Sequence, residues 1–162
     1  MPAPRPLSFA SVTEAPEEAD RLRAAGYAKR GNWDLRQIAD HCAAWIEYEL
    51  SGEYPTPWYA RPVFFAMRKT VGPGMLRKIL AEGHMKAGVP TDPQTVPPPA
   101  EGTDEAERAA LARLRTAADR LAAHHGPVPN SPIFGPVTNE QAKRLHAIHC
   151  AHHLGFLEPK PQ

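Results

Sequence analysis

Apolar residues recur at intervals of three and four positions in several segments of this chain, the pattern of helices that bury one face. The clearest case is residues 34–50, where Asn32 or Asp34 offers an N-cap and Ser51-Gly52 marks the end. Its apolar stripe consists of Leu35, Ile38, Cys42, Trp45 and Ile46. Similar patterns and capping residues predict a first helix over residues 14–25, a long third helix over residues 104–125, and a last helix that follows Thr138.

Two shorter helices are predicted between the second and third long ones. PVFFAMRKTV begins at Pro62, MLRKILAEG ends near Gly83, and Gly72-Pro73-Gly74 is a break between them. The proline-rich stretch 87–102 predicts an extended linker, and no segment alternates as a β-strand does. Four long helices with a helical insertion between the second and third predict an all-α fold, a four-helix bundle. The long connection lets the second and third helices run parallel.

Composition excludes several classes of protein. The 162 residues fit a single domain, which we place at residues 13–157, after a flexible lead-in of residues 1–12 and before a tail of residues 158–162. The 19 basic and 18 acidic residues are well mixed, which argues against binding to nucleic acid. No apolar run approaches the ~20 residues of a membrane span, so we expect no membrane partner. Without a secretory signal or a disulfide framework, the expected location is cytoplasmic.

Histidines are concentrated in two of the predicted helices. Four lie within eight residues of the last helix: His146, His149, His152 and His153. A fifth, His41, lies at the edge of the apolar stripe of the second helix. Three of the four on the last helix project toward its apolar side, where burying imidazoles without partners is costly. The pattern predicts a metal site built from imidazoles of two helices.

The spacing alone leaves several ligand sets open. His149 and His153 are four residues apart and can aim two imidazoles at one ion. His149 with His152, or the set His146, His149 and His153, would also serve. A third imidazole from a neighbouring helix would leave positions open for water or substrate, as in reactive metal sites. The alternative without a metal is a buried polar network of histidines.

Other polar and aromatic residues have simpler interpretations. His124 and His125 end the third helix, where they complement its dipole, and His84 is expected in a solvated loop. Cys42 is expected to be a small core residue, and Cys150 to face away from the histidines. Glu47 and Glu49 are candidates for groups that support the site or act as a base, although solvated helix charges are the simpler interpretation. The residues that could wall an entrance are Tyr48, Tyr54, Trp58 and Tyr59.

The combination of these motifs resembles a known group of proteins. IADHCAAW in the second helix, followed by IHCAHHLGF in a capped last helix, is similar to the DinB/YfiT-like superfamily of bacterial four-helix metal proteins. More narrowly, GNWDLRQIADHCAAWIEYELSG with SPIFGPVTNEQAKRLHAIHCAHHLGFL resembles an uncharacterised domain family within it. The resemblance covers residues from about 10 to 157, and its specificity comes from the order of short motifs.

The resemblance implies an up-down-down-up bundle with one divalent ion. It implies that His41, His149 and His153 bind the ion and that water completes the shell, and it also implies a homodimer. Two positions depart from the pattern. The segment before the last helix reads Ser131-Pro132-Ile133-Phe134-Gly135 in place of a start with His-Pro, and Leu154 follows the second histidine where better-known members have arginine. These departures weaken the transfer of any particular activity, but not of the three histidines.

Two functions compete on this basis. The first is a metal-dependent enzyme, a thiol-dependent transferase or a hydrolase, that acts on a small molecule. An ion with three neutral ligands keeps its full charge and acidifies a bound water or thiol. The second is a non-catalytic binding or stress-response module whose metal ties the last helix to the second. Three imidazoles suit several divalent ions, among which zinc is favoured over nickel or iron.

Overall fold

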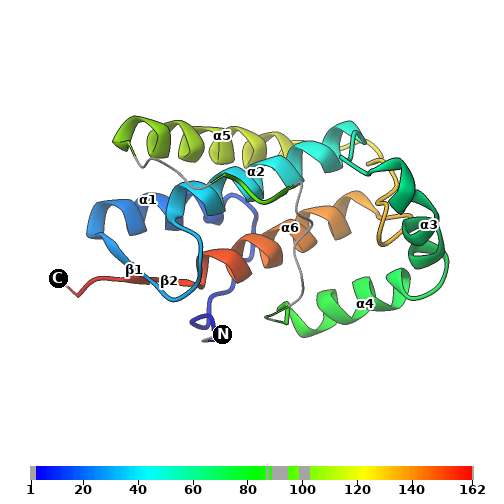
Figure 1. Ribbon diagram of the computed structural model, residues 1–162, viewed down its shortest axis with the longest axis horizontal. Coiled ribbons are helices and arrows are strands. Elements are labelled where there is room, and N and C mark those ends of the chain that lie inside the picture. Colours follow the sequence, from blue (N-terminus) through cyan, green and yellow to red (C-terminus); the bar gives the residue numbers. More distant parts are fainter. Residues whose placement is uncertain (1–2, 87, 89–94, 99–102, 162) are drawn as a thin grey trace.

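The computed structural model describes residues 3–86, 88, 95–98 and 103–161. This part of the chain is mostly helical, as predicted, and adds a small two-stranded sheet that the sequence did not indicate (Figure 1). The elements in chain order are α1 Glu14–Ala25, β1 Tyr27–Lys29, α2 Leu35–Ser51, the 3-10 helix η1 Trp58–Ala60, α3 Arg61–Lys69, α4 Gly72–Glu82, α5 Asp104–Ala122, α6 Asn139–Leu154 and β2 Leu157–Pro159. Most of the predicted linker 87–102 lies outside the described residues. No described helix has the length and low polarity needed to cross a membrane.

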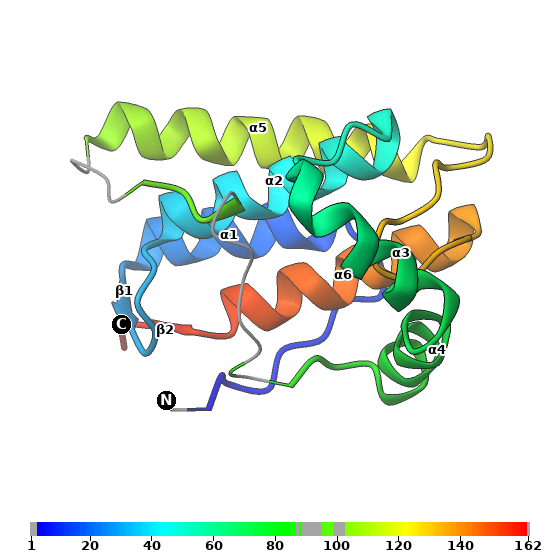
Figure 2. The ribbon, with the colours of Figure 1, turned by 45° about the vertical axis from the view of Figure 1, so that its right-hand side comes forward.

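The four long helices α1, α2, α5 and α6 lie side by side (Figures 1 and 2). α2 and α5 run in one direction, and α1 and α6 run in the other. Their facing sides form the main core, in which many small alanine side chains let the helices approach closely. The largest apolar side chains that are fully buried there include Leu22, Leu35, Ile38, Ile46, Leu114, Leu121 and Leu154.

Capping interactions define where the two histidine-bearing helices begin. The side chain of Asp34 accepts a hydrogen bond from the backbone N–H of Gln37, and the Gln37 side chain accepts one from the backbone N–H of Asp34. Thr138 and Gln141 form the same reciprocal capping box at the start of α6. These bonds satisfy N–H groups that a helix start leaves without partners. The choice between Asn32 and Asp34 as N-cap is thereby decided in favour of Asp34.

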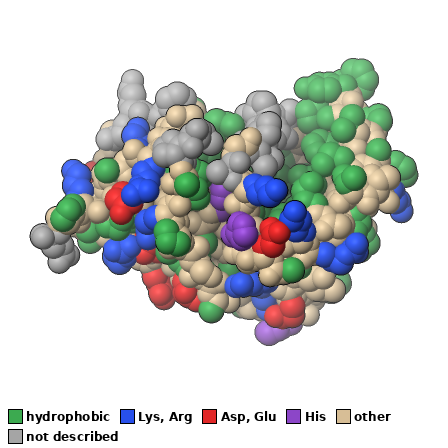
Figure 3. Space-filling model, turned by 90° about the horizontal axis from the view of Figure 1, so that it is seen from below, with side chains coloured by type: hydrophobic (Ala, Val, Ile, Leu, Met, Phe, Trp, Pro, Cys, Tyr) green, Lys and Arg blue, Asp and Glu red, His purple; other side chains and the backbone are tan. Residues whose placement is uncertain are grey.

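The insertion of η1, α3 and α4 covers one end of α6 (Figure 2). A second, smaller core joins Leu76 of α4 to Val137, Ala142 and Leu145 around the start of α6. The outer side of the insertion is apolar and exposed, and Figure 3 shows hydrophobic side chains gathered at this end of the molecule. The exposed large apolar residues of the insertion are Trp58, Tyr59, Val63, Phe65, Val71 and Met75.

Gly72 is part of α4 and not of a break between two helices. Gly72-Pro73-Gly74 forms the first turn of the helix, which suits a proline because its missing N–H has no partner there. A Cβ atom at Gly72 would lie 2.0 Å from the carbonyl oxygen of Ile133. Glycine at this position therefore lets α4 pack directly against the backbone of the loop that leads to α6.

Both ends of the described chain contact the helices. β1 and β2 pair antiparallel, with Ala28 opposite Glu158, and so join the end of α1 to the segment after α6. We expected residues 1–12 to be a flexible lead-in; here Phe9 and Val12 are buried in the main core, and Arg5 forms an ion pair with Glu18. The boundaries of the domain stay a prediction.

Candidate metal centre

The Nε2 atoms of His41 of α2 and of His149 and His153 of α6 lie close together. The Nε2 atom of His149 lies 3.3 Å from that of His41 and 3.0 Å from that of His153. The ligand atoms of all three lie within 4.8 Å of one another. His149 and His153 are one helical turn apart and therefore share a face of α6, and the packing of α2 against α6 places His41 opposite them. The three histidines could hold a metal ion.

A hydrogen bond to the backbone fixes the orientation of His41. Its Nδ1 atom lies 2.8 Å from the carbonyl oxygen of Thr95. Because a carbonyl oxygen only accepts, Nδ1 carries the hydrogen and donates it, which leaves a lone pair on Nε2. Histidines that bind metals are commonly held in this way, with the second ring nitrogen donating to a carbonyl or carboxylate.

The geometry fits a divalent ion with tetrahedral coordination. Zinc–nitrogen bonds of about 2.0–2.1 Å place two tetrahedral ligand atoms about 3.3 Å apart, close to the two separations from the Nε2 atom of His149. Hydrogen bonds alone fit less well, since the Nε2 atom of His149 faces two other Nε2 atoms and carries at most one proton. A cation at the centre would satisfy all three lone pairs together.

The surroundings keep the three imidazoles neutral. Burial, followed by the neighbouring His153 and His41 rings, lowers the pKa of His149 well below its usual value. Burial and then His41 do the same to the pKa of His153. Burial also lowers the pKa of His41, although the hydrogen bond to Thr95 acts in the opposite direction. Neutral imidazoles are the form that binds metals, so little proton release would oppose binding near neutral pH.

Aromatic rings enclose the site on two sides. The Trp33 ring stacks on His153 with centroids 5.4 Å apart and an angle of 16°. The Trp45 ring lies edge-on to His41 and to His149, with centroids 6.3 Å apart in both cases. His41 is 1% exposed, whereas His149 and His153 are only partly buried. The site therefore has aromatic walls but is not fully closed to solvent.

The other histidines of α6 are not part of this group. The His152 ring packs edge-on against Phe156, with centroids 5.4 Å apart, and burial lowers its pKa. His146 lies closer to the second half of α2, where its Nε2 atom is 3.7 Å from Oε2 of Glu49. Among the ligand sets that the spacing left open, the structure therefore brings together the one that includes His41.

The two cysteines lie in the main apolar core. Both are free and buried, and the contact with Cys150, together with burial, raises the pKa of the Cys42 thiol well above its usual value. A thiol held in this protonated form is a poor metal ligand. The interpretation of Cys42 as a core residue is confirmed, and both cysteines are separate from the histidine group among the described residues.

The structure shows a buried polar cluster that the sequence pattern did not reveal. Glu49 is 3% exposed, and its Oε2 atom accepts a hydrogen bond of 2.7 Å from the Tyr54 hydroxyl. Burial, and then the charge and hydrogen bond of Glu49, raise the pKa of Tyr54. His146 completes this cluster. Glu47, by contrast, forms an ion pair with Arg113 at the surface. The spacing of four residues from Trp45 to Glu49 places both on one face of α2, and it was the signal in the sequence that could have indicated this cluster.

Of the aromatic residues considered for the entrance, two lie near the site and two lie away from it. Tyr48 and Tyr54 contact Trp45 and lie near the site, with ring centroids 6.1 and 6.2 Å from that of Trp45. Trp58 and Tyr59, also considered for the entrance, are 79% and 68% exposed on the outside of the insertion. Trp33, which the sequence did not single out, is the ring that covers His153.

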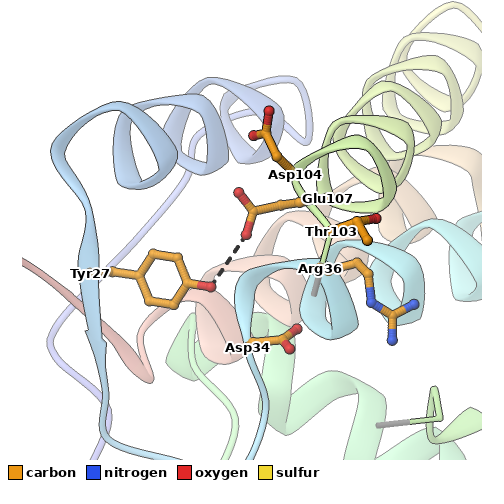
Figure 4. Close-up of a pocket in the computed structure, with 6 residues that line it drawn as sticks. All are labelled: Tyr27, Asp34, Arg36, Thr103, Asp104 and Glu107. Atoms are coloured by element: carbon orange, nitrogen blue, oxygen red, sulfur yellow. Dashed lines mark hydrogen bonds between the residues drawn. The ribbon is translucent and has the colours of Figure 1, made fainter. Parts of the chain in front are cut away.

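A separate cavity of about 300 Å³ lies near the starts of α2 and α5 (Figure 4). Tyr27 stands at one side, and its hydroxyl donates a hydrogen bond of 3.4 Å to Glu107. The remaining lining residues are Asp34, Arg36, Thr103 and Asp104. None of the site histidines lines this cavity, and its charged groups are those of ordinary helix starts. The histidine group is therefore the stronger candidate for chemistry.

Comparisons with known proteins identify the family but no activity. A family model described as "Protein of unknown function (DUF1569)" matches residues 1–160. No curated protein and no solved structure matches the chain. Because the match extends over nearly the whole sequence, the chain belongs to this family of proteins of unknown function, DUF1569.

Proposed function

We propose that this protein is a metal-dependent enzyme that acts on a small molecule at a site formed by His41, His149 and His153. The observation that carries the proposal is the proximity of three Nε2 atoms. That of His149 lies 3.3 Å from that of His41 and 3.0 Å from that of His153. These separations match those between ligands of one tetrahedral ion. Zinc is the metal we favour over nickel or iron, because a tetrahedral set of imidazoles suits it well.

Three protein ligands and a partly open site support catalysis over a purely structural role. Structural zinc sites usually close the shell with four protein ligands, whereas catalytic sites keep one position free. In such a position a divalent ion would acidify a bound water or thiol, as a hydrolase or a thiol-dependent transferase requires. The protein's own contribution would be to orient His41 through the Thr95 carbonyl and to exclude water with Trp33 and Trp45.

The proposal extends to fold family and assembly. We infer a four-helix bundle of the DinB-like, up-down-down-up type, supported by the directions of α1, α2, α5 and α6 in Figure 1. A homodimer is proposed on the exposed apolar side chains of the insertion, such as Trp58 and Phe65. The balanced charge argues against a nucleic-acid partner. A small-molecule substrate and a bacterial cytoplasmic setting are part of the same proposal.

A non-catalytic role for the metal is the alternative. The ligands come from two helices, so an ion would link α2 to α6 and would stabilise their packing even without turnover. In that case the metal serves a binding or stress-response module. The two roles differ in whether the ion accepts an outside ligand.

Metal analysis of protein purified without a histidine tag tests the site. We expect about one divalent ion per chain, lost in His41→Ala and retained in the matched control His125→Ala, whose histidine is exposed in the loop after α5. Helicity measured by circular dichroism should be the same in both variants. A wild-type protein that binds no divalent ion would refute the proposal and leave the hydrogen-bonded network of histidines.

Cobalt substitution separates the enzyme from the structural alternative. The visible absorption of the Co²⁺-loaded protein should change when 2-mercaptoethanol is added, because an open position accepts the thiolate. An unchanged spectrum, together with a large drop in melting temperature on removal of the metal, would favour the structural role.

A further inference from the structure

The polar interface between α2 and α6 extends beyond the three histidines. His41, Trp45 and Glu49 are spaced by four residues on α2, so they share a face and span about 12 Å along the helix axis. α6 runs antiparallel to α2 (Figure 1). The residues of α6 that face this stripe, in reverse order, are His153, His149 and His146. The candidate metal centre at one end is therefore continuous with Glu49 and His146 at the other.

Glu49 and His146 are buried with polar atoms that have no partner among the described residues. The two residues are 3% and 4% exposed. Tyr54 donates to Oε2 of Glu49, but Oε1 and both ring nitrogens of His146 make no hydrogen bond within the described chain. The separation of 3.7 Å between His146 and Glu49 is too long for one. Because buried polar groups are nearly always paired, these atoms need partners that the described chain does not supply.

Three aromatic rings pack against one another near Glu49, and the hydroxyl of one of them, Tyr54, donates a hydrogen bond to its carboxyl group. The centroids of Trp45, Tyr48 and Tyr54 lie 6.1, 6.2 and 6.3 Å apart in pairs. All three residues are only partly buried, so a ligand can reach them from solvent. Aromatic faces attract cations, and a carboxylate beside them adds a hydrogen-bond acceptor of opposite charge.

We propose that Glu49, His146 and these aromatic rings form a subsite for an ammonium group. The ligand would be a small aminoalkyl compound whose other end reaches the histidine site, so the inference rests on the proposed function of that site. An ammonium group donates the hydrogen bonds that Oε1 of Glu49 lacks. An anionic group would be repelled by the carboxylate, and an apolar group would leave the buried oxygen without a partner.

Binding of butylammonium, compared with butanol and butyrate of equal chain length, tests the charge preference. NMR titration of the protein, with and without zinc, should show butylammonium shifting the indole resonance of Trp45 and the ring resonances of His146. Butanol and butyrate should bind at least about tenfold more weakly, the ratio that a difference of 1.4 kcal/mol gives.

Two variants locate the source of the preference. Glu49→Gln keeps the shape of the side chain and should weaken butylammonium binding about tenfold. Glu47→Gln removes the same charge from an exposed position two residues away and should leave the affinity unchanged. Zinc content should be equal in both variants and the wild type, since neither residue belongs to the three-histidine group.

The outcomes separate this inference from the proposed function. Zinc binding without any preference for butylammonium would overturn the subsite, leave the metal site intact and point to ordered water as the partner of Glu49. Failure to bind zinc, with butylammonium binding that depends on Glu49, would refute the metal site and retain an amine-binding protein. If Glu49→Gln fails to fold, the wild-type titration still decides, because shifts elsewhere than at Trp45 and His146 would contradict the assigned location.

Discussion

Two neighbouring faces of α2 contrast in what they bury. One carries Leu35, Ala39, Ala43 and Ile46 into the main core with α1 and α5, where apolar contacts need no particular partner atom. The other carries His41, Trp45 and Glu49 toward α6, where each polar atom needs one. The first face makes the helix stable in its place, and the second uses that place for specific contacts. Stability and metal binding should therefore respond separately to substitution on the two faces.

The largest difference between the effects on metal binding and on stability is expected when a metal ligand is removed. His149→Ala should reduce metal affinity by more than the 10–100-fold that removal of an outer partner costs, because it removes the imidazole between the other two. The free energy of unfolding of the metal-free variant should be close to that of the metal-free wild type. Zinc titration and urea denaturation measure the two effects. Equal zinc affinity in variant and wild type would place the ion elsewhere.

Leu114→Ala tests the main core, into which the apolar face of α2 packs. Leu114 is fully buried on α5, and truncation of such a leucine costs about 2–5 kcal/mol of folding free energy. The folded variant should still bind one equivalent of the ion as the wild type does. Denaturation followed by metal analysis at a temperature where the variant is folded checks this. Loss of the ion in the folded variant would show that the two faces are coupled.

Acidification should lower the stability that the histidines of the polar face contribute. The folded-state pKa values of His41, His149 and His153 are lowered from the usual 6.5, so the unfolded chain binds more protons. The stability that the neutral imidazoles contribute is therefore present above pH 6.5 and decreases as pH falls through that value toward their folded pKa values. Denaturant midpoints of the metal-free protein should fall over this range, and less steeply in His149→Ala. Identical slopes would contradict the assignment.

The smallest effect is expected where α2 begins. Asp34→Ala removes the acceptor of the capping box and should cost about 1 kcal/mol, with little change in metal affinity. Replacement by asparagine, which also caps helices well, should restore most of the stability. A loss of metal binding in Asp34→Ala would mean that the position of His41 depends on the first turn of its helix.

The sequence predicted the helices more closely than the contacts between them. Apolar spacing placed α1 at residues 14–25, and Thr138 and Gln141 placed the start of α6, since these signals are local. The start of α2 was left open between Asn32 and Asp34, of which Asp34 is the observed N-cap. Gly72 was interpreted as a break between helices because the contact that requires a glycine there is with the backbone of Ile133, 61 residues away in the sequence. The strands β1 and β2 were missed because three-residue strands are too short to alternate recognisably.

For the site, the chain by itself established that His149 and His153 share one face of the last helix, because that follows from 3.6 residues per turn. The third histidine of the group comes from α2 and not from α6: it is His41, and neither His146 nor His152. This depended on the antiparallel packing of α2 on α6. Packing also buried Glu49 beside His146 while leaving Glu47 in solvent, and set Trp33 against His153. Periodicity fixes directions around one helix axis, whereas distances between helices arise from non-local packing of their apolar sides, which only the folded structure contains.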